Sequence, residues 1–368
     1  MPPYLLLIAF TVFTLGSLAA QDPAHETITW HPAQDLTLEG VAFEDTERPF
    51  DRLPARARDT VREPVWNLSR QSAGLCARFR TAAPEIRVRW SLTGEELALP
   101  HMPATGVSGV DLYVRDGTAW RWLGTGKPTR RENNTSTLAK KLDPLPEGDT
   151  REYVVHFPLY NGTESLEIGV PAEFQVKPLP RPASASRPIV FYGTSITQGG
   201  CASRPGMPHT ALLGRRLERP VVNLGFSGNG RMEQPVTDLL AEIDAAAYVI
   251  DCLPNMRAEE VAKRTRPLVH SLRAARPNVP ILLTEDRTYG YAYLQSEARQ
   301  INASNRAALR AAYESLLAEG VEDLYYLAGD DLLGSDGEAT VDGSHPTDLG
   351  FMRQAKAFEP VLRQMLDS

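Results

Sequence analysis

The spacing of hydrophobic residues divides the chain into two parts, and the first part has the pattern of β-strands. Across 75–79 and 86–92, apolar residues occupy every second position. This alternation buries one face of a strand and leaves the other in solvent. Turn-forming Gly, Pro, Asn and Asp separate such segments from about residue 21 to 176, and no long helical pattern interrupts them. We therefore expect an all-β sandwich that is jelly-roll-like. Further strands are expected at 110–114, 120–123, 153–157, 166–170 and 174–176.

The second part alternates short apolar strands with amphipathic helices. Residues 178–188, with four prolines among small residues, cannot build a core and are predicted to be a linker. The alternation after this linker predicts a parallel, doubly wound sheet with helices on both faces. Strands are expected at 189–192, 221–224, 247–251, 281–284 and 324–327, and helices at 210–218, 233–244, 258–275, 297–319 and 348–366.

The length of 368 residues suits two domains preceded by an export signal. The predicted organisation is a signal peptide at 1–20, a β-sandwich at 21–177, the linker, and an α/β domain at 189–368. Residues 4–18 are almost wholly apolar, and small residues precede Gln21, so we expect cleavage after Ala19 or Ala20. The mature protein would be secreted or periplasmic, without stable membrane insertion. An uncleaved anchor is the alternative, although the run is shorter than the ~18 to 20 residues that span a bilayer.

Charge and cysteine usage exclude some classes of partner. The chain has 39 Lys and Arg against 46 Asp and Glu, a net charge of −7, with no long basic run, so we expect no nucleic-acid partner. Cys76, Cys201 and Cys252 lack the Cys-x-x-Cys spacing of metal sites, and no metal is expected. Cys201 and Cys252 both follow strands of the predicted sheet. They are either a disulfide at its carboxyl edge or two buried thiols.

A serine in the segment 193–199 has the setting of a nucleophile. Ser195 follows the apolar strand at 189–192, and flanking glycines permit a sharp turn that exposes a hydroxyl. Asp342 and His345, three residues apart, supply the base that a serine needs and the group that orients this base. No Gly-x-Ser-x-Gly motif is present, which argues against an α/β-hydrolase. The pattern therefore predicts a serine esterase.

Four short segments lie just beyond predicted strands, at 193–199, 223–229, 253–255 and 342–345. Their order and spacing resemble the SGNH, or GDSL-type, hydrolase superfamily over residues 189–368. In addition, Gly-Val-Asp-Leu-Tyr at 109–113 resembles the Gly-x-Asp-Leu-Tyr signature of a β-domain that precedes some of these hydrolases. The resemblance implies a flavodoxin-like three-layer α/β/α fold and the activity of an esterase, lipase or carbohydrate deacetylase.

The same resemblance assigns roles to individual residues. Ser195 would be the nucleophile, His345 the base and Asp342 its partner. The backbone N–H of Ser195 would form an oxyanion hole with Gly228 and Asn255. Donors of this kind stabilise the negative charge that develops on the carbonyl oxygen, each by about 2.7 to 4 kcal/mol.

The chain departs from the family pattern at three positions near these groups. Thr194 stands where the family usually has Asp, and Leu253 and Met256 replace a Gly and an Asp that commonly flank Asn255. None of the three removes a group that handles protons or charge.

Five further polar residues are candidates for substrate contact. His101 lies in a Pro-bounded loop of the β-domain that either reaches the active-site mouth or lies on the surface. Arg204 and His209 follow Ser195 in a loop that could line the same mouth. Glu285 and Arg287 precede three tyrosines and could clamp a substrate while the rings stack on sugars, or they could simply belong to a structured loop.

We expect hydrolysis of a carboxylic ester through an acyl-enzyme, without metal or cofactor. An acetyl group on a carbohydrate, small or polymeric, is the expected substrate. Transfer of the acyl group to a sugar hydroxyl at the same site is an alternative. A protein of another class, which binds glycans and carries an inert hydrolase-like domain, is a further alternative, and the intact set of Ser195, Asp342 and His345 argues against it.

Overall fold

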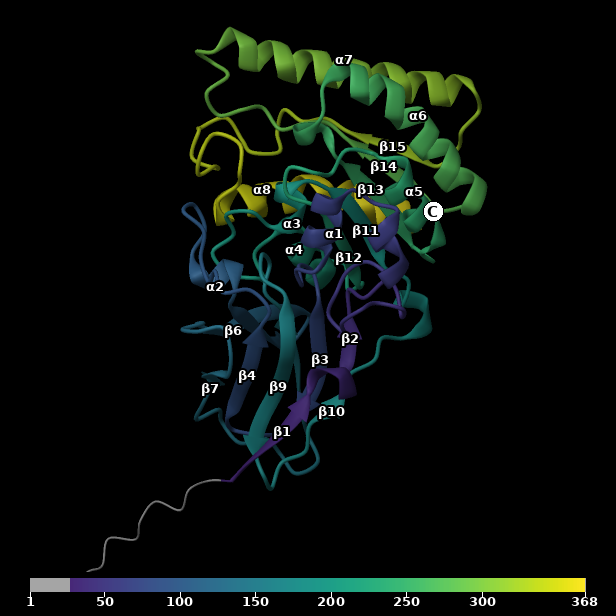
Figure 1. Ribbon diagram of the computed structural model, residues 1–368. Helices are drawn as coiled ribbons and strands as arrows, with labels where there is room; N and C mark the ends of the chain where they lie inside the picture. Colours follow the sequence, from purple (N-terminus) through teal and green to yellow (C-terminus); the bar gives the residue numbers. More distant parts are fainter. Residues whose placement is uncertain (1–26, 368) are drawn as a thin grey trace, which may run out of the picture.

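The computed structural model describes residues 27–367, and its first half is a two-sheet β-sandwich (Figure 1). One sheet has four strands in the order β1-β9-β4-β7, and the other has the order β10-β3-β8-β5-β6 with β2 beside β3. All paired strands in these two sheets are antiparallel. The strands are β1 Ile28–Pro32, β2 Thr37–Glu39, β3 Cys76–Thr81, β4 Ile86–Leu92, β5 Val110–Asp116, β6 Ala119–Gly126, β7 Asn134–Ala139, β8 Arg151–His156, β9 Thr163–Pro171 and β10 Lys177–Pro178.

The alternating residues fill the space between the two sheets, as the sequence predicts. Leu75, Phe79, Val88 and Trp90 are buried in one cluster. The strand expected at 174–176 is not formed. The chain turns after β9, in one sheet, and crosses to β10, in the other, so these residues connect the two sheets. The predicted signal peptide lies outside the described residues.

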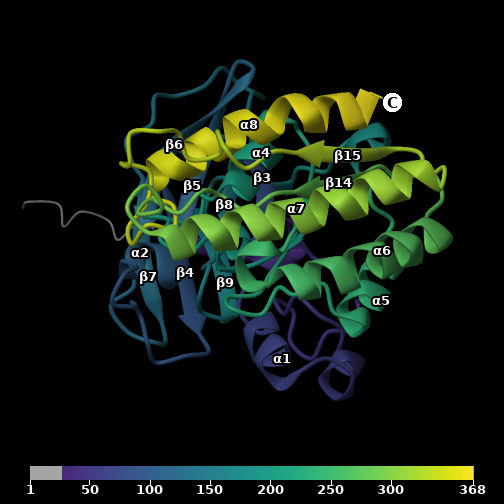
Figure 2. The ribbon, with the colours of Figure 1, turned by 90° about the horizontal axis from the view of Figure 1, so that it is seen from above.

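The second half is a five-stranded parallel sheet with the order β12-β11-β13-β14-β15. Helices α5, α6 and α7 cover one face, and α4 and α8 cover the other (Figure 2). The flavodoxin-like prediction is therefore confirmed. The strands are β11 Ile189–Gly193, β12 Val221–Gly225, β13 Ala247–Asp251, β14 Ile281–Thr284 and β15 Leu324–Leu327. The helices are α3 Ser195–Gln198, α4 His209–Arg216, α5 Gln234–Glu242, α6 Ala258–Ala275, α7 Ser296–Ala318 and α8 Asp348–Asp367.

The strand order places the end of β11 at the point where the direction of winding reverses. The chain passes from β11 to β12 on one side and then returns to β13 on the other. In open α/β sheets, ligands bind at such a switch point, beyond the carboxyl ends of the strands.

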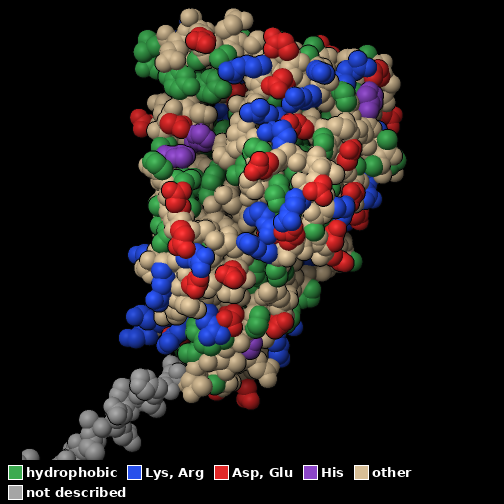
Figure 3. All heavy atoms as spheres, in the orientation of Figure 1, with side chains coloured by type: hydrophobic (Ala, Val, Ile, Leu, Met, Phe, Trp, Pro, Cys, Tyr) green, Lys and Arg blue, Asp and Glu red, His purple; other side chains and the backbone are tan. Residues whose placement is uncertain are grey.

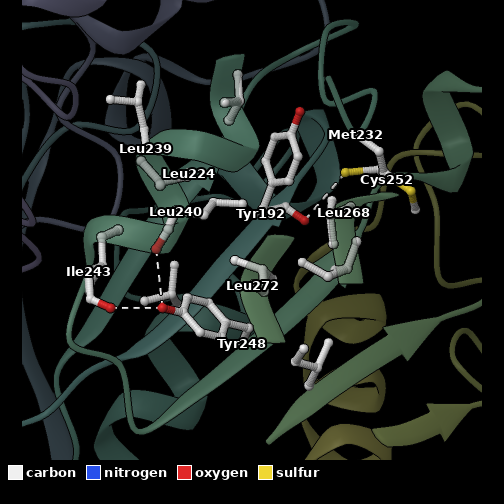
Figure 4. Packing of buried hydrophobic residues seen from close by; sticks show 14 of the residues in the cluster. Tyr192, Leu224, Met232, Leu239, Leu240, Ile243, Tyr248, Cys252, Leu268 and Leu272 are labelled. Atoms are coloured by element: carbon white, nitrogen blue, oxygen red, sulfur yellow. Dashed lines mark hydrogen bonds between the residues drawn. The ribbon is translucent and has the colours of Figure 1, made fainter. Parts of the chain in front are cut away.

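Behind this edge the core is closely packed, and the buried Tyr248 hydroxyl donates to the carbonyls of Leu240, at 3.1 Å, and Ile243, at 2.7 Å (Figure 4).

A segment of the first half packs on the core of the second, which the sequence did not indicate. Residues 40–70 leave the sandwich after β2 and contain a 3₁₀ helix, Ala55–Asp59, and the helix α1, Glu63–Ser69. Apolar side chains of this segment, including Leu53 and Trp66, belong to the same buried cluster as Val190 of β11. The segment lies beside the α/β sheet in both ribbon views (Figures 1 and 2).

The Gly-x-Asp-Leu-Tyr signature lies at the junction of the two halves. The buried Asp111 carboxylate accepts from Arg204 Nη1, at 2.6 Å, and from the N–H of Gly206, at 3.1 Å. Arg215 stacks over the ring of Tyr113, 3.8 Å from its centroid. The predicted linker is also fixed to the β-domain, because Arg181 in the linker forms an ion pair with Glu39 of β2 at 2.6 Å. The β-domain is therefore docked on the α/β domain.

None of the helices between residues 27 and 367 is long and apolar enough to cross a membrane.

Candidate active site

Ser195 is presented by a tight turn between β11 and the one-turn helix α3. Thr194 is the N-cap of this helix, and its side chain accepts from the N–H of Ile196 at 3.2 Å. The threonine that replaces the family's usual Asp therefore still caps the helix, with a neutral oxygen. Glycine is required at Gly193, since a Cβ there would lie 2.1 Å from Thr197 Oγ1. The Ser195 side chain is at the edge of the sheet and is nearly buried.

His345 and Asp342 complete a hydrogen-bonded chain with Ser195. Ser195 Oγ lies 2.8 Å from His345 Nε2, and His345 Nδ1 lies 2.7 Å from Asp342 Oδ2. An ionised carboxylate only accepts, so Nδ1 carries the proton and Nε2 is left to accept from the serine hydroxyl. This arrangement can take a proton from Ser195 and make its oxygen a nucleophile.

The loop that carries this pair is fixed by its own backbone. Asp342 Oδ1 accepts from the N–H groups of Ser344, at 3.0 Å, and His345, at 2.8 Å. Burial raises the pKa of Asp342, but these N–H groups and the imidazole outweigh it and hold the pKa below its ordinary value. Gly343 turns the loop with φ +86°, and a Cβ there would lie 2.4 Å from the Tyr291 ring.

Three hydrogen-bond donors near Ser195 have no acceptor among the described residues. They are the N–H of Ser195, the N–H of Gly228 and Nδ2 of Asn255. The Asn255 side chain is oriented because its Oδ1 accepts from the N–H of Gly230 at 3.3 Å. Gly230 in turn packs on the Ser195 turn, where a Cβ would lie 1.9 Å from Gly193 O. Free donors beside a nucleophile are suited to bind an oxyanion.

The β-domain contributes two side chains to the same region. The Tyr160 hydroxyl donates to Ser195 O at 3.1 Å, and burial raises the pKa of this phenol, so it stays protonated. The His101 ring lies 5.7 Å from the His345 ring, centroid to centroid. His101 is exposed at the tip of a turn closed by paired backbone bonds between Leu99 and Met102. The structure therefore brings His101 to the active-site mouth, whereas sequence reasoning gave no signal for Tyr160.

Arg204 and His209, the two candidates in the loop after Ser195, do not line this mouth. Arg204 pairs with the buried Asp111 and joins the two domains instead. His209 is fully buried, with its ring stacked on those of Phe351 and Phe358. Burial lowers the pKa of His209 well below its ordinary value, and Arg287 adds to this effect, so the ring is neutral. A position in the loop after Ser195 did not reveal that Arg204 turns to the junction of the two domains and His209 to the interior.

Glu285 and Arg287 are also buried and act within the fold. Glu285 accepts from Arg310, at 2.8 Å, and from the N–H of Gly329, at 2.9 Å. The Arg287 guanidinium binds both carboxylate oxygens of Asp251, the last residue of β13. Neither residue can clamp a substrate from such a position, so the structure supports the alternative of a structured loop.

The three cysteines are free and buried, so the disulfide alternative was wrong. Cys252 Sγ donates to Tyr192 O at 3.6 Å, and Cys201 packs against Met102 and Val107 of the β-domain. Within residues 27–367, no group of three or more His, Cys, Asp or Glu is placed to hold a metal ion.

Comparison with known proteins identifies the family. Residues 186–363 match the GDSL-like lipase/acylhydrolase family, and residues 28–176 match GxDLY, the N-terminus of SGNH-hydrolase-type esterases. No curated protein sequence matches the chain. A putative GDSL-like lipase from Bacteroides ovatus is 35% identical, with a TM-score of 0.86 over 93% of this chain and 98% of that one.

Two more distant structures share the fold. One is a salicylyl-acyltransferase from a tetracycline biosynthetic pathway, 18% identical, with a TM-score of 0.71 over 94% of this chain and 96% of that one. The other is a family two carbohydrate esterase from Clostridium thermocellum in complex with cellohexaose, 15% identical, with a TM-score of 0.56 over 80% and 93%. With both parts of the sequence matched, and a relative 35% identical over nearly its whole length, the chain belongs to the GDSL-like lipase/acylhydrolase family and is a carboxylic ester hydrolase.

Proposed function

We propose that the protein is an exported esterase that removes acetyl groups from a carbohydrate, with Ser195 as the nucleophile. The observation that carries the proposal is the distance of 2.8 Å between Ser195 Oγ and His345 Nε2, beside three donors that find no acceptor within residues 27–367. Export rests on the apolar segment at 4–18 and its small-residue cleavage site.

Each group has one task in the proposed reaction. Ser195 Oγ forms a bond to the ester carbonyl carbon as its proton moves to His345 Nε2. The N–H groups of Ser195 and Gly228 and the Asn255 amide donate to the oxygen that becomes negative. The bond to the alcohol then breaks, and His345 returns the proton to the leaving oxygen. Water repeats the sequence on the acyl-enzyme and releases acetate.

Aromatic side chains beside the loop of Asp342 and His345 support a carbohydrate substrate. Tyr291 lies against Gly343, and Tyr293 is 78% exposed. Together with Leu294 they place apolar surface over the segment that precedes α7, where green side chains gather at the upper left of Figure 3. Tyr289 and Tyr293 also line a groove of about 540 Å³ next to this surface. Flat rings at a groove can stack on sugar faces, and the Clostridium esterase of the same fold binds cellohexaose.

Acyl transfer needs the same groups, with a hydroxyl in place of water. The salicylyl-acyltransferase shares the arrangement of a β-domain and an α/β domain. Product analysis with and without an added sugar acceptor separates the two reactions, because only transfer yields a new ester.

The test is acetate release from acetylated polysaccharides and from 4-nitrophenyl acetate. Ser195→Ala is expected to lower turnover by at least about 1,000-fold. Ser344→Ala is the matched control, because it changes a serine that lies between Asp342 and His345 and keeps the backbone N–H from which Asp342 Oδ1 accepts. A fluorophosphonate should label Ser195 alone. Retained turnover in Ser195→Ala, or labelling of another serine, would overturn the assignment.

A further inference from the structure

Arg52, a residue of the β-domain sequence, is buried beneath the loop that contains Gly228. Its side chain is 1% exposed and donates only to backbone carbonyls. Nε donates to Gln71 O at 2.8 Å, and Nη2 donates to Leu68 O at 2.7 Å. Nη1 reaches across to the α/β domain and donates to Asn223 O, at 3.0 Å, and Gly225 O, at 2.7 Å.

The buried charge has no carboxylate partner among the described residues. Asp51, its neighbour in sequence, pairs with Arg70 instead, at 3.1 Å. Burial lowers the pKa of Arg52 to about 9, which still leaves the guanidinium charged at neutral pH. Four carbonyl dipoles and the face of Phe226, 5.0 Å from the guanidinium carbon, compensate this charge. A buried cation is costly without such compensation, so its site is closely defined in geometry.

The two carbonyls that Arg52 Nη1 binds belong to the end of β12, immediately before the loop that contains Gly228. Gly225 is the last residue of β12, and the proposed donor Gly228 follows three residues later. The side chain of Asn223 joins this strand end to the nucleophile's helix, because Nδ2 donates to Thr197 O at 2.7 Å. The guanidinium therefore holds the backbone from which the Gly228 turn projects.

A second path leads from Arg52 to the same loop through two glutamines. The backbone carbonyl of Gln71 accepts from Arg52, and its side-chain Oε1 accepts from Gln198 Nε2. Gln198 Oε1 accepts from the N–H of Ser227 at 3.0 Å. Ser227 directly precedes Gly228, so both paths end within three residues of the proposed oxyanion donor.

We propose that Arg52 is a positioning residue of the oxyanion hole, which aims the N–H of Gly228 by holding the end of β12. The proposal rests on the assigned role of Gly228. Because an oxyanion exists only in the transition state and the intermediates, loss of this alignment lowers kcat and leaves KM nearly unchanged.

The test compares Arg52→Lys with Arg56→Ala. Lysine keeps the charge but cannot reach four carbonyls, and we expect kcat to fall about 10- to 100-fold with KM within about 2-fold. Affinity for a boronate transition-state analogue should fall by a similar factor. Arg56 also joins the two domains, through Glu242, but its side chain is 48% exposed and its guanidinium binds Asp45 and Glu242 rather than the end of β12. Arg56→Ala should change neither kcat nor boronate affinity.

A double variant distinguishes positioning from a general loss of structure. If Arg52 acts through the oxyanion hole, Arg52→Lys should cost less in an Asn255→Ala background than in the wild type, because the hole is already impaired. The proposal would be overturned if Arg52→Lys left kcat unchanged, with active sites counted by fluorophosphonate titration. It would also be overturned if the loss in the double variant equalled the product of the two single losses. If Arg52→Lys does not fold, Arg52→Gln, whose neutral amide can still donate to part of this set of carbonyls, decides by the same measurements. Failure of the proposed function is a separate result, since it requires turnover by Ser195→Ala.

Discussion

At the scale of single residues, hydrogen bonds decide what each polar group can do. Asp342 accepts from two backbone N–H groups and the imidazole, which holds its pKa low and keeps it an acceptor. Such motifs are local, so Asp342 and His345 could be found from their spacing in the sequence. The contacts of His209 could not, because the same residue types occur in cores and at sites.

Asp342→Asn is expected to lower kcat by about 100- to 10,000-fold, less than the loss in Ser195→Ala. An amide can donate to Nδ1 and thereby favour the wrong imidazole tautomer, while the oxyanion donors and the nucleophile remain. The measurement is kcat on 4-nitrophenyl acetate for both variants. A loss equal to that of Ser195→Ala would show that the carboxylate does more than orient the imidazole.

Asp286 couples stability to pH. Burial raises its pKa from 3.8 to about 7, and the nearby Arg287 only partly opposes this. The folded state therefore binds the proton more tightly than the unfolded chain. Its contribution to stability is complete below about pH 4 and is lost as the pH rises to about 7, by at most about 1.4 kcal/mol per pH unit. Asp286→Asn removes this dependence, while the amide oxygen can still accept from Asn302 Nδ2, as Asp286 Oδ2 does at 3.2 Å.

The measurement is urea unfolding of the wild type and Asp286→Asn between pH 4.5 and 8. The variant should gain stability relative to the wild type as the pH rises. A difference in unfolding free energy that stays constant across this range would contradict a raised pKa at Asp286.

At the scale of elements, periodicity located most strands and helices, but loops carried no comparable information. The helix predicted at 258–275 matches α6 at both ends. In contrast, the strand expected at 174–176 is a crossing between sheets, and α1 was not foreseen. For the segment after β14 the sequence left a substrate clamp and a structured loop as alternatives, and the structure supports the second, because Glu285 and Arg287 are buried and bind groups of the protein. Tertiary contacts decide the direction of a loop side chain, and one sequence does not contain them.

The turn at 99–102 is the loop element that we expect to recognise the alcohol of the substrate. Met102 is buried against Cys201, which anchors the turn to the α/β domain and holds His101 beside His345. Replacing Leu99, His101 and Met102 with Ser should lower kcat/KM on an acetylated sugar or polysaccharide more than on 4-nitrophenyl acetate, whose alcohol is small.

His270→Ala is the control for this prediction, since His270 is a half-exposed histidine on α6 that pairs with Glu319. His270→Ala should leave kcat/KM unchanged on both the acetylated carbohydrate and 4-nitrophenyl acetate. Equal losses on both substrates in the turn variant would indicate damage to His345 itself, and unchanged kinetics on both would remove the turn from substrate recognition.

At the scale of the whole molecule, the covalent linker is not the boundary of packing. The sequence predicts a division at 178–188, but residues 40–70 cross it and complete the hydrophobic core of the α/β domain. Three further side chains from before the linker bind groups of the α/β domain. They are those of Arg52, Gln71 and Tyr160, which bind Asn223 O, Gln198 Nε2 and Ser195 O. Composition and periodicity describe each half alone, so they cannot show that one half completes the other.

The crossing segment is expected to stabilise the catalytic domain directly. Leu53 is fully buried against the α/β core although it lies 125 residues before the linker. Leu53→Ala removes buried methyl groups and should lower the free energy of unfolding by about 2 to 5 kcal/mol. Leu294→Ala makes the same chemical change at a side chain that is 76% exposed, and should shift stability by less than about 0.5 kcal/mol.

Urea unfolding of both variants, followed by esterase activity and by tryptophan fluorescence, checks this expectation. Because Leu53 packs on the α/β domain, activity and fluorescence should be lost together in a single transition that moves to lower urea in Leu53→Ala. If the two halves were independent, Leu53→Ala would shift a separate transition of the β-domain and leave the urea dependence of activity in place. That outcome would contradict a shared core and would show that the two halves unfold as separate units divided at the linker.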